Sequence, residues 1–177
     1  MTAIVLVVLA AVAMEPVAAI SHRALMHGRA WRWHASHHAS SRGARLAAAD
    51  GVEANDLFPL WFALLTVTVM AVASAVGALR PLLWIGAGVT LYGAAYLVVH
   101  DVCIHGRLGR PFGAGRYLTW VKEAHRAHHR TGAAPYGFLV PVVPRDRRRG
   151  SADDSCAVAT VASLRPVETR TRPEKTS

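Results

Sequence analysis

The sequence contains few cysteines and lysines, and no histidine occurs between residues 39 and 99. Cys103 and Cys156 are the only two cysteines among the 177 residues, so no disulfide framework is indicated. Two of the 20 basic residues are lysines, and the formal net charge of +9 therefore comes mostly from arginine. A basic balance of this kind is typical of proteins that bind nucleic acid or an anionic membrane surface.

Charged residues are almost absent from three long segments, and this absence decides between those two partners. Residues 2–20, 57–79 and 82–99 are apolar, with Glu15 as their only charged side chain. A helix needs about 20 apolar residues to cross a bilayer, and the first segment reaches that length if it continues to Leu25. Soluble proteins that bind nucleic acid do not need such segments. We therefore expect a lipid membrane as partner and no nucleic acid.

The first apolar segment has an alternative interpretation, a cleaved signal peptide, because the Ala-Val-Ala motif at residues 11–13 is typical of a cleavage site. The positively charged region that starts a signal peptide is absent, however, and the apolar run continues beyond the motif. We therefore favour a membrane helix. Glu15 lies inside it, where an ionisable group faces protein or water rather than lipid. We expect Glu15 to support the functional site, although a position near the helix end would bring it to solvent.

The segments between the apolar runs are polar or short. Residues 28–56 form a polar connection in which Trp31 and Trp33 are expected to anchor the membrane interface rather than to stack on a substrate. The acidic group at residues 53–56 is expected to cap the next helix rather than to bind metal. The short turn at residues 77–81 makes the second and third apolar helices antiparallel neighbours.

Three glycines in the third apolar segment, Gly86, Gly88 and Gly93, predict close packing between helices. A channel for a bulky substrate is the alternative. Together the apolar segments predict an all-α fold, an integral membrane bundle of about three to four membrane helices with a histidine-rich cap.

The chain becomes polar again after the third apolar segment. Residues 116–130 are expected to form a helix that is too polar to span and lies at the surface. From residue 144 onward the chain is rich in Arg, Ser, Thr and Pro without periodicity, which is typical of disorder. The sequence thus predicts a membrane domain at residues 1–143 and a basic, disordered tail at residues 144–177.

All ten histidines fall into four short groups. Residues three or four apart share one face of a helix, so the second and fourth groups can each direct three imidazoles to one point. The pairs separated by five residues lie about 140° apart on a regular helix. We expect these pairs to flank a site from two sides or to lie where a helix ends. The groups are His22 and His27; His34, His37 and His38; His100 and His105; and His125, His128 and His129.

The three membrane helices place all four histidine groups at one face of the membrane. The first two groups follow the first helix, and the other two follow the third helix, which ends on the same side. Arginines crowd these segments, whereas Arg80 is the only cation expected on the opposite side. By the positive-inside rule, we expect the histidine site on the cytoplasmic face of the cell inner membrane.

The number of histidines predicts a metal centre. Ten imidazoles exceed the three or four ligands of one zinc site, which leaves two metal ions, or one ion with many supporting histidines. Nitrogen ligands suit zinc, copper, iron or nickel, so the spacing does not select the metal. Asp101 is expected to support a ligating histidine rather than to bind metal itself, and Cys103 to be a small buried filler. We expect no catalytic protein nucleophile or general acid beyond the metal ligands.

The order HxxxxH, HxxHH, HDxxxH, HxxHH resembles the fatty acid hydroxylase superfamily of membrane di-iron oxygenases. The sequence motifs EANDLF, AHRAHH and YGFL are similar to those of bacterial β-carotene hydroxylases, and the resemblance covers roughly residues 14–141. It implies two non-haem iron ions held by the ten histidines, and O2 activated with electrons from a ferredoxin-type donor. It also implies hydroxylation of β-carotene at carbon 3 of its β-ionone rings, through β-cryptoxanthin to zeaxanthin. Because this substrate is wholly apolar, we expect it to enter the site from the bilayer.

Three rival functions remain open. One is the same chemistry on another lipid or carotenoid, as in a fatty acid or sterol hydroxylase, a desaturase or a ketolase. Another is a membrane metal transporter, which predicts histidines or carboxylates inside the spans, where only Glu15 lies. The third is a structural membrane protein, which predicts little loss of function when His37 or His128 is replaced by alanine.

Overall fold

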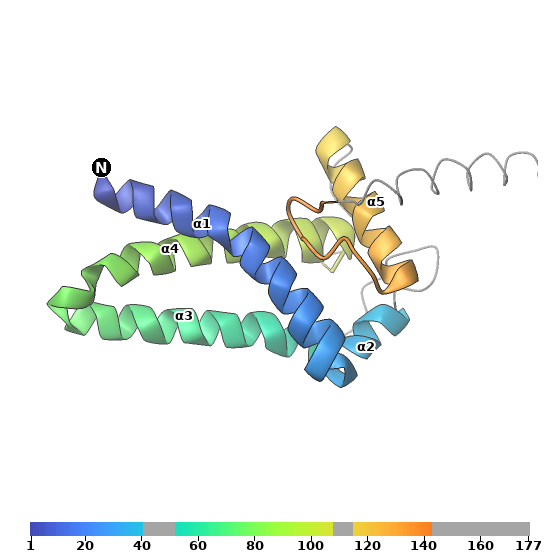
Figure 1. Ribbon diagram of the computed structural model, residues 1–177, viewed down its shortest axis with the longest axis horizontal. Helices are drawn as coiled ribbons and strands as arrows, with labels where there is room; N and C mark the ends of the chain where they lie inside the picture. Colours follow the sequence, from blue (N-terminus) through green and yellow to red (C-terminus); the bar gives the residue numbers. More distant parts are fainter. Residues whose placement is uncertain (41–51, 108–114, 143–177) are drawn as a thin grey trace, which may run out of the picture. The chain divides into compact units, whose positions relative to one another are not determined.

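A computed structural model describes residues 1–40, 52–107 and 115–142. Every regular element in these ranges is a helix (Figure 1). Contacts divide the chain into two units, Met1–Val142 and Val143–Ser177, and all described residues belong to the first. The predicted tail at residues 144–177, with Cys156, lies outside the described residues.

Three helices in the described part of the chain are long and apolar enough to cross a membrane. They are Thr2–Arg29, Ala54–Ala75 and Gly77–Ile104, with a mean hydropathy of 2.5, 2.0 and 1.8 in their most apolar stretch. The predicted all-α fold and its three apolar helices are confirmed. In chain order the elements are α1 (Thr2–Ser21), η1 (His22–Arg29), α2 (Trp31–Ser40), η2 (Ala54–Asp56), α3 (Leu57–Ala75), η3 (Gly77–Leu79), α4 (Arg80–Tyr96), η4 (Leu97–Ile104) and α5 (Arg116–Thr131).

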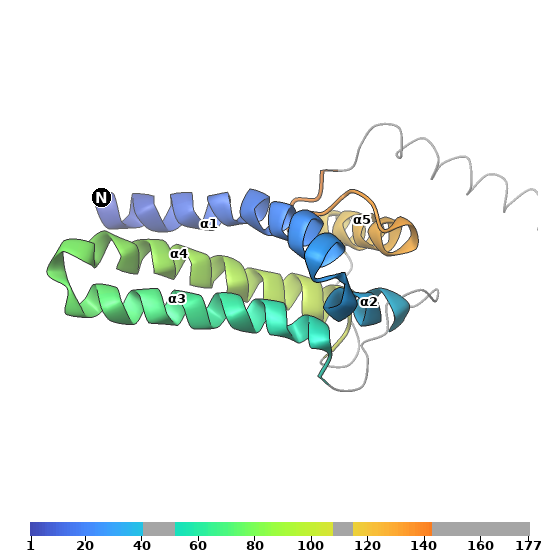
Figure 2. The same cartoon turned by 60° about the horizontal axis from the view of Figure 1, so that its bottom comes forward.

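The helices bring the histidine-bearing elements to one end of the bundle. α3 and α4 run antiparallel and lie side by side, as the short turn between them predicts (Figure 1 and Figure 2). Pro81 lies in the first turn of α4, where its missing N–H costs nothing. α1 packs mainly on α4. Both views show α2, α5 and the C-terminal ends of the first and third membrane helices together at the end opposite to the N-terminus.

Two of the three glycines in α4 allow close helix packing. A Cβ atom on Gly88 would meet the Val7 carbonyl oxygen and would lie 2.7 Å from the Cβ of Ala10, so α1 approaches α4 at this point. Gly86 is likewise crowded, by a methionine of α3. Gly93 differs, because a Cβ atom there would have nothing within 4 Å. Close packing is thus confirmed for Gly86 and Gly88, and Gly93 faces open space.

The two histidine pairs separated by five residues belong to π-helices: His22 and His27 lie in η1, and His100 lies in η4, with His105 as its C-cap. A π-helix joins residues five apart, as in the hydrogen bond from the His105 N–H to the His100 carbonyl oxygen, at 3.0 Å. Residues i and i+5 then lie close together. The ring centroids are 5.0 Å apart for His22 and His27, and 4.6 Å apart for His100 and His105. The expected position where a helix ends is therefore confirmed, and the two rings of each pair lie side by side there.

Candidate metal centre

The ten histidines converge, and nine of them form two compact groups. In cluster A, one nitrogen from each of five histidines lies within 4.8 Å of the others; its members are His22, His27, His34, His38 and His128. In cluster B the same holds for His37, His100, His105 and His125. His129 belongs to neither group, but its Nε2 lies 2.8 Å from the Nε2 of His125. All of these side chains except His27 are buried.

Helices α2 and α5 contribute to both clusters. Neighbouring residues on a helix point about 100° apart, so His37 turns to cluster B while His38 turns to cluster A. On α5, His128 belongs to cluster A, and His125 belongs to cluster B with His129 beside it. The rings of His38 and His129 stack with their centroids 4.4 Å apart. The two clusters are therefore adjacent, and α2 and α5 carry histidines of both.

Oxygen atoms orient four of the rings from outside the clusters. Each oxygen accepts a hydrogen bond from Nδ1 of a histidine, which leaves the lone pair of that ring on Nε2. Metal-binding histidines are usually held in this way, because the acceptor fixes both the tautomer and the orientation of the ring. The pairs, with distances of 2.6 to 2.9 Å, are His34 with Asn55 Oδ1, His100 with Asp101 Oδ1, His128 with the Ala133 carbonyl and His22 with the Tyr136 carbonyl.

The contacts between rings fit a metal ion. His22 and His34 each donate from Nδ1, so their Nε2 atoms, 3.1 Å apart, both present lone pairs that would repel each other without a cation between them. Imidazole nitrogens bind a metal at about 2.0–2.1 Å, which brings two ligands of one ion to within about 3 Å of each other. The Nε2 atoms of His105 and His125 in cluster B are 2.9 Å apart. Both clusters therefore have the spacing of ligands that share an ion.

Protons do not supply that cation at neutral pH. Burial lowers the pKa of His34 and of His38 to about 3, and that of His128 to about 4. These rings are therefore neutral at pH 7, which is the form that binds metals. The Asp101 carboxylate holds Nδ1 of His100, and the buried Nε2 of that ring has no hydrogen-bond partner among the described residues. A metal ion accounts for such a buried, unpaired nitrogen.

The acidic cap of η2, the turn that leads into α3, also reaches the histidines. The predicted capping is confirmed, because the Asp56 carboxylate accepts a hydrogen bond from the Glu53 N–H at 3.0 Å. In addition, the Glu53 carboxylate lies 3.7 Å from His37 Nδ1, and this contact lowers the pKa of Glu53. Asn55, between them, holds His34. The cap therefore contacts one histidine of each cluster, a role that the sequence analysis missed.

Glu15 acts on the site through the segment that follows α5. Its carboxylate accepts hydrogen bonds from the backbone N–H groups of Phe138, Leu139 and Val140, at 2.9 to 3.2 Å. It also accepts one from the Tyr92 hydroxyl, at 2.7 Å. The group therefore has protein partners, as expected for a carboxylate in a membrane helix. The same segment supplies the carbonyl that orients His22.

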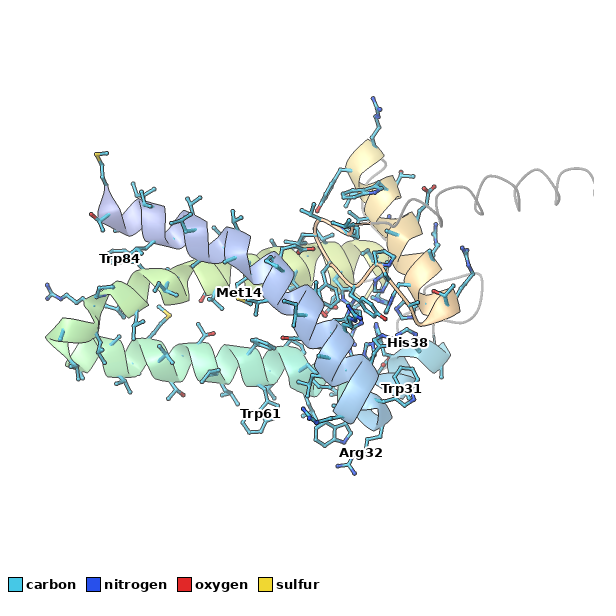
Figure 3. All side chains as sticks on the ribbon, viewed as in Figure 1. Met14, Trp31, Arg32, His38, Trp61 and Trp84 are labelled. Carbon is cyan, nitrogen blue, oxygen red and sulfur yellow. The ribbon has the colours of Figure 1, made fainter. Side chains whose placement is uncertain are left out.

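Trp31 covers part of cluster A. Its ring centroid lies 5.3 Å from that of His27 and 5.4 Å from that of His38, while 40% of its surface stays exposed. Figure 3 shows Trp31 and His38 close together, with Arg32 directed away from the clusters. Trp31 therefore separates cluster A from its surroundings, in addition to the interfacial position predicted for it. Cys103 is buried, as predicted.

A cavity of about 420 Å³ lies between α1, α3 and α4, and two of its lining residues contact a histidine. Its lining is mostly apolar and includes Met14, which Figure 3 labels on α1, and Gly93 on α4. Asp101 and Phe138 line it at the histidine end, and both contact His100. An apolar molecule in this cavity would therefore have one end beside the clusters.

Three apolar helices, two of which end at the histidine clusters, define a membrane metalloprotein, and the chain belongs to the fatty acid hydroxylase family. The model of that family matches residues 7–150. The chain is 40% identical over 146 residues to the β-carotene hydroxylase of Pseudescherichia vulneris, with 80% of this chain and 78% of the relative covered. It is 39% identical over 133 residues to that of Pantoea ananas, covering 72% and 71%.

The similarity extends to plant proteins. The chain is 38% identical over 138 residues to the chloroplastic β-carotene 3-hydroxylase 2 of Arabidopsis thaliana, with 75% of this chain and 43% of the relative covered. No solved structure matches the chain. The family match includes all four histidine groups.

Proposed function

We propose that the chain hydroxylates carbon 3 of the β-ionone rings of β-carotene, forming β-cryptoxanthin and then zeaxanthin. The observation that carries the proposal is the similarity to β-carotene hydroxylases over 80% of the chain. The apolar cavity supports it, because a carotenoid is apolar over its whole length and would leave the bilayer between the helices. In each hydroxylation one oxygen atom of O2 enters the C–H bond and the other leaves as water, with two electrons and two protons from a donor.

Two iron ions are the proposed cofactors, one in each cluster. Iron would supply the activation of O2 that attack on an unactivated C–H bond needs. The five histidines of cluster A would hold one ion, and the four of cluster B, together with His129, the other. Asp101 and Asn55 would hold the rings of His100 and His34 in the ligating orientation.

Electrons are proposed to arrive from a ferredoxin-type donor on the cytoplasmic side of the inner membrane. Arg23, Arg29 and Arg32 are exposed at the histidine end of the helices, whereas Arg80 lies at the other end. This bias favours a cytoplasmic histidine end. Arg126 and Arg130 are exposed one turn apart on α5, and such cations favour the approach of an acidic protein.

Expression in cells that accumulate β-carotene tests the proposal. We expect β-cryptoxanthin and zeaxanthin to appear, and to require O2. A new ketone at carbon 4 would instead identify a ketolase. An unchanged pigment profile in cells that contain abundant, iron-loaded protein would contradict the proposal and would favour another lipid substrate.

Filling the cavity should impair hydroxylation without removing iron. Gly93 lines the cavity, and a side chain there meets no atom within 4 Å, so the Gly93→Leu side chain would take up space proposed for the substrate. Overfilling a packed site costs about 1–3 kcal/mol, and we expect kcat/KM to fall about tenfold to a hundredfold. Gly77→Leu is the matched control, since Gly77 has equal space but lies in the turn outside the cavity. Equal kcat/KM values for the two variants would contradict the assignment of the cavity.

A further inference from the structure

Phe138 connects the cavity with both histidine clusters. Its ring stacks on His22 of cluster A, with centroids 4.8 Å apart and planes at 11°. It also lies 5.2 Å from the ring of His100 of cluster B, at 89°. Phe138 is 6% exposed and lines the cavity. Among the described residues, this is the aromatic ring that lines the cavity and also contacts a histidine of each cluster.

The position of this ring is fixed relative to the cavity walls. Glu15 of α1 accepts the N–H of Phe138 at 2.9 Å, and the same carboxylate accepts the Tyr92 hydroxyl of α4 at 2.7 Å. Gly137 permits this close approach, because a Cβ atom there would lie 2.6 Å from Glu15 Oε1. The Tyr96 ring packs against the Phe138 ring at 5.0 Å. α1 and α4, which both line the cavity, therefore hold Phe138 at the end of the cavity nearest the histidines.

We propose that Phe138 is the specificity-determining residue that limits how far the substrate ring reaches toward the clusters, and that it thereby selects the carbon that is hydroxylated. This inference rests on the proposed function. An apolar cavity has few polar groups that could fix a long polyene at one position along its length. The cavity wall that the end of the polyene meets therefore sets that position. A smaller side chain at this wall lets the substrate ring move closer to the clusters. Carbons next to carbon 3 then come within reach of the oxidant.

The test compares two aromatic residues of the same segment. Tyr136 also contacts His22, with centroids 5.6 Å apart, but it does not line the cavity. Phe138→Ala, Phe138→Leu and Tyr136→Leu are expressed with β-carotene, and the positions of the hydroxyl groups in the products are determined by chromatography and NMR. Iron content and the quenching of tryptophan fluorescence by β-carotene in the metal-free proteins are measured in parallel.

We expect Phe138→Ala and Phe138→Leu to retain iron and to bind β-carotene, and the fraction of product hydroxylated away from carbon 3 to rise at least tenfold. Tyr136→Leu should keep hydroxylation at carbon 3, whatever its rate. Hydroxylation only at carbon 3 by an iron-loaded Phe138→Leu variant would overturn the inference, as would an equal shift in Tyr136→Leu. Loss of iron in Phe138→Leu would also overturn it, because Phe138 would then maintain the clusters. If the unaltered protein does not hydroxylate β-carotene, the proposed function itself fails.

Discussion

The His34→Ala variant is expected to insert into the membrane, to lose the metal of cluster A and to hydroxylate less than about one hundredth as fast as the unaltered protein. His34 Nε2 lies 3.1 Å from the Nε2 atoms of both His22 and His38, so its removal takes away a central ligand. Loss of a residue that merely supports a ligand costs about 10–100-fold in metal affinity or activity, and loss of the ligand should cost more. Metal analysis and turnover of the purified variant measure the effect.

Asn55→Leu should give an intermediate result. The His34 ring would remain but would lose the 2.6 Å hydrogen bond that orients it, and we expect metal affinity to fall about 10–100-fold. Arg32→Gln serves as the control, because Arg32 is exposed on α2, the helix that carries His34, and points away from the clusters. A His34→Ala variant with unchanged metal content and turnover would show that His34 is not a ligand.

The Glu15→Leu variant is expected to lose stability on the order of 3 kcal/mol or more, and iron with it. The change leaves three backbone N–H groups and the Tyr92 hydroxyl without their acceptor. Phe138 and Tyr92 are buried, whereas Val140 is exposed, and each unsatisfied buried group costs about 1–3 kcal/mol. It also releases the segment whose Tyr136 carbonyl orients His22. Thermal unfolding in detergent and iron content measure both effects.

Tyr92→Phe is the matched control for Glu15→Leu. It removes one hydrogen bond and leaves the three backbone donors paired with the carboxylate, so we expect a loss of about 1 kcal/mol and full iron content. If Glu15→Leu unfolds at the same temperature as Tyr92→Phe, the carboxylate does not anchor this segment.

The features that the sequence predicted are local in the chain. The apolar length of residues 57–79 and 82–99 and the turn between them are enough to specify two antiparallel membrane helices. A spacing of four likewise places His34 and His38 on one helix face. These predictions needed only the periodicity of a regular helix. The expectation that each group of three directs all its imidazoles to one point is wrong, because His37 and His125 belong to cluster B while His38 and His128 belong to cluster A.

The features that the sequence did not predict depend on irregular backbone and on distant contacts. The side-by-side placement of His100 and His105 comes from a π-helix, whereas a regular helix would direct two residues five apart about 140° from each other. His22 is oriented by a backbone carbonyl more than 100 residues away, and a carbonyl has no signature in a sequence. Capping of the next helix was enough to explain the polar residues at 53–56, so the hydrogen bond between Asn55 and His34 was not predicted.

The division of the histidines between two clusters also required the structure. His37 and His38 are adjacent in the chain, yet they belong to different clusters, because neighbouring side chains on α2 point about 100° apart. Which side of α2 faces which cluster depends on how α2 packs against η1 and η2. The sequence therefore predicted a metal centre, but neither the number of ions nor the ligands of each.

Metal stoichiometry in the active protein tests the central claim most directly. Iron per chain is measured in purified protein that converts β-carotene, then after chelation, and then after reconstitution with Fe(II) or with zinc. We expect two iron ions per chain, loss of turnover on chelation, and recovery with Fe(II) but not with zinc. A single metal ion per chain at full turnover, or full turnover of the zinc-loaded protein, would contradict the assignment of the two histidine clusters as a pair of iron sites.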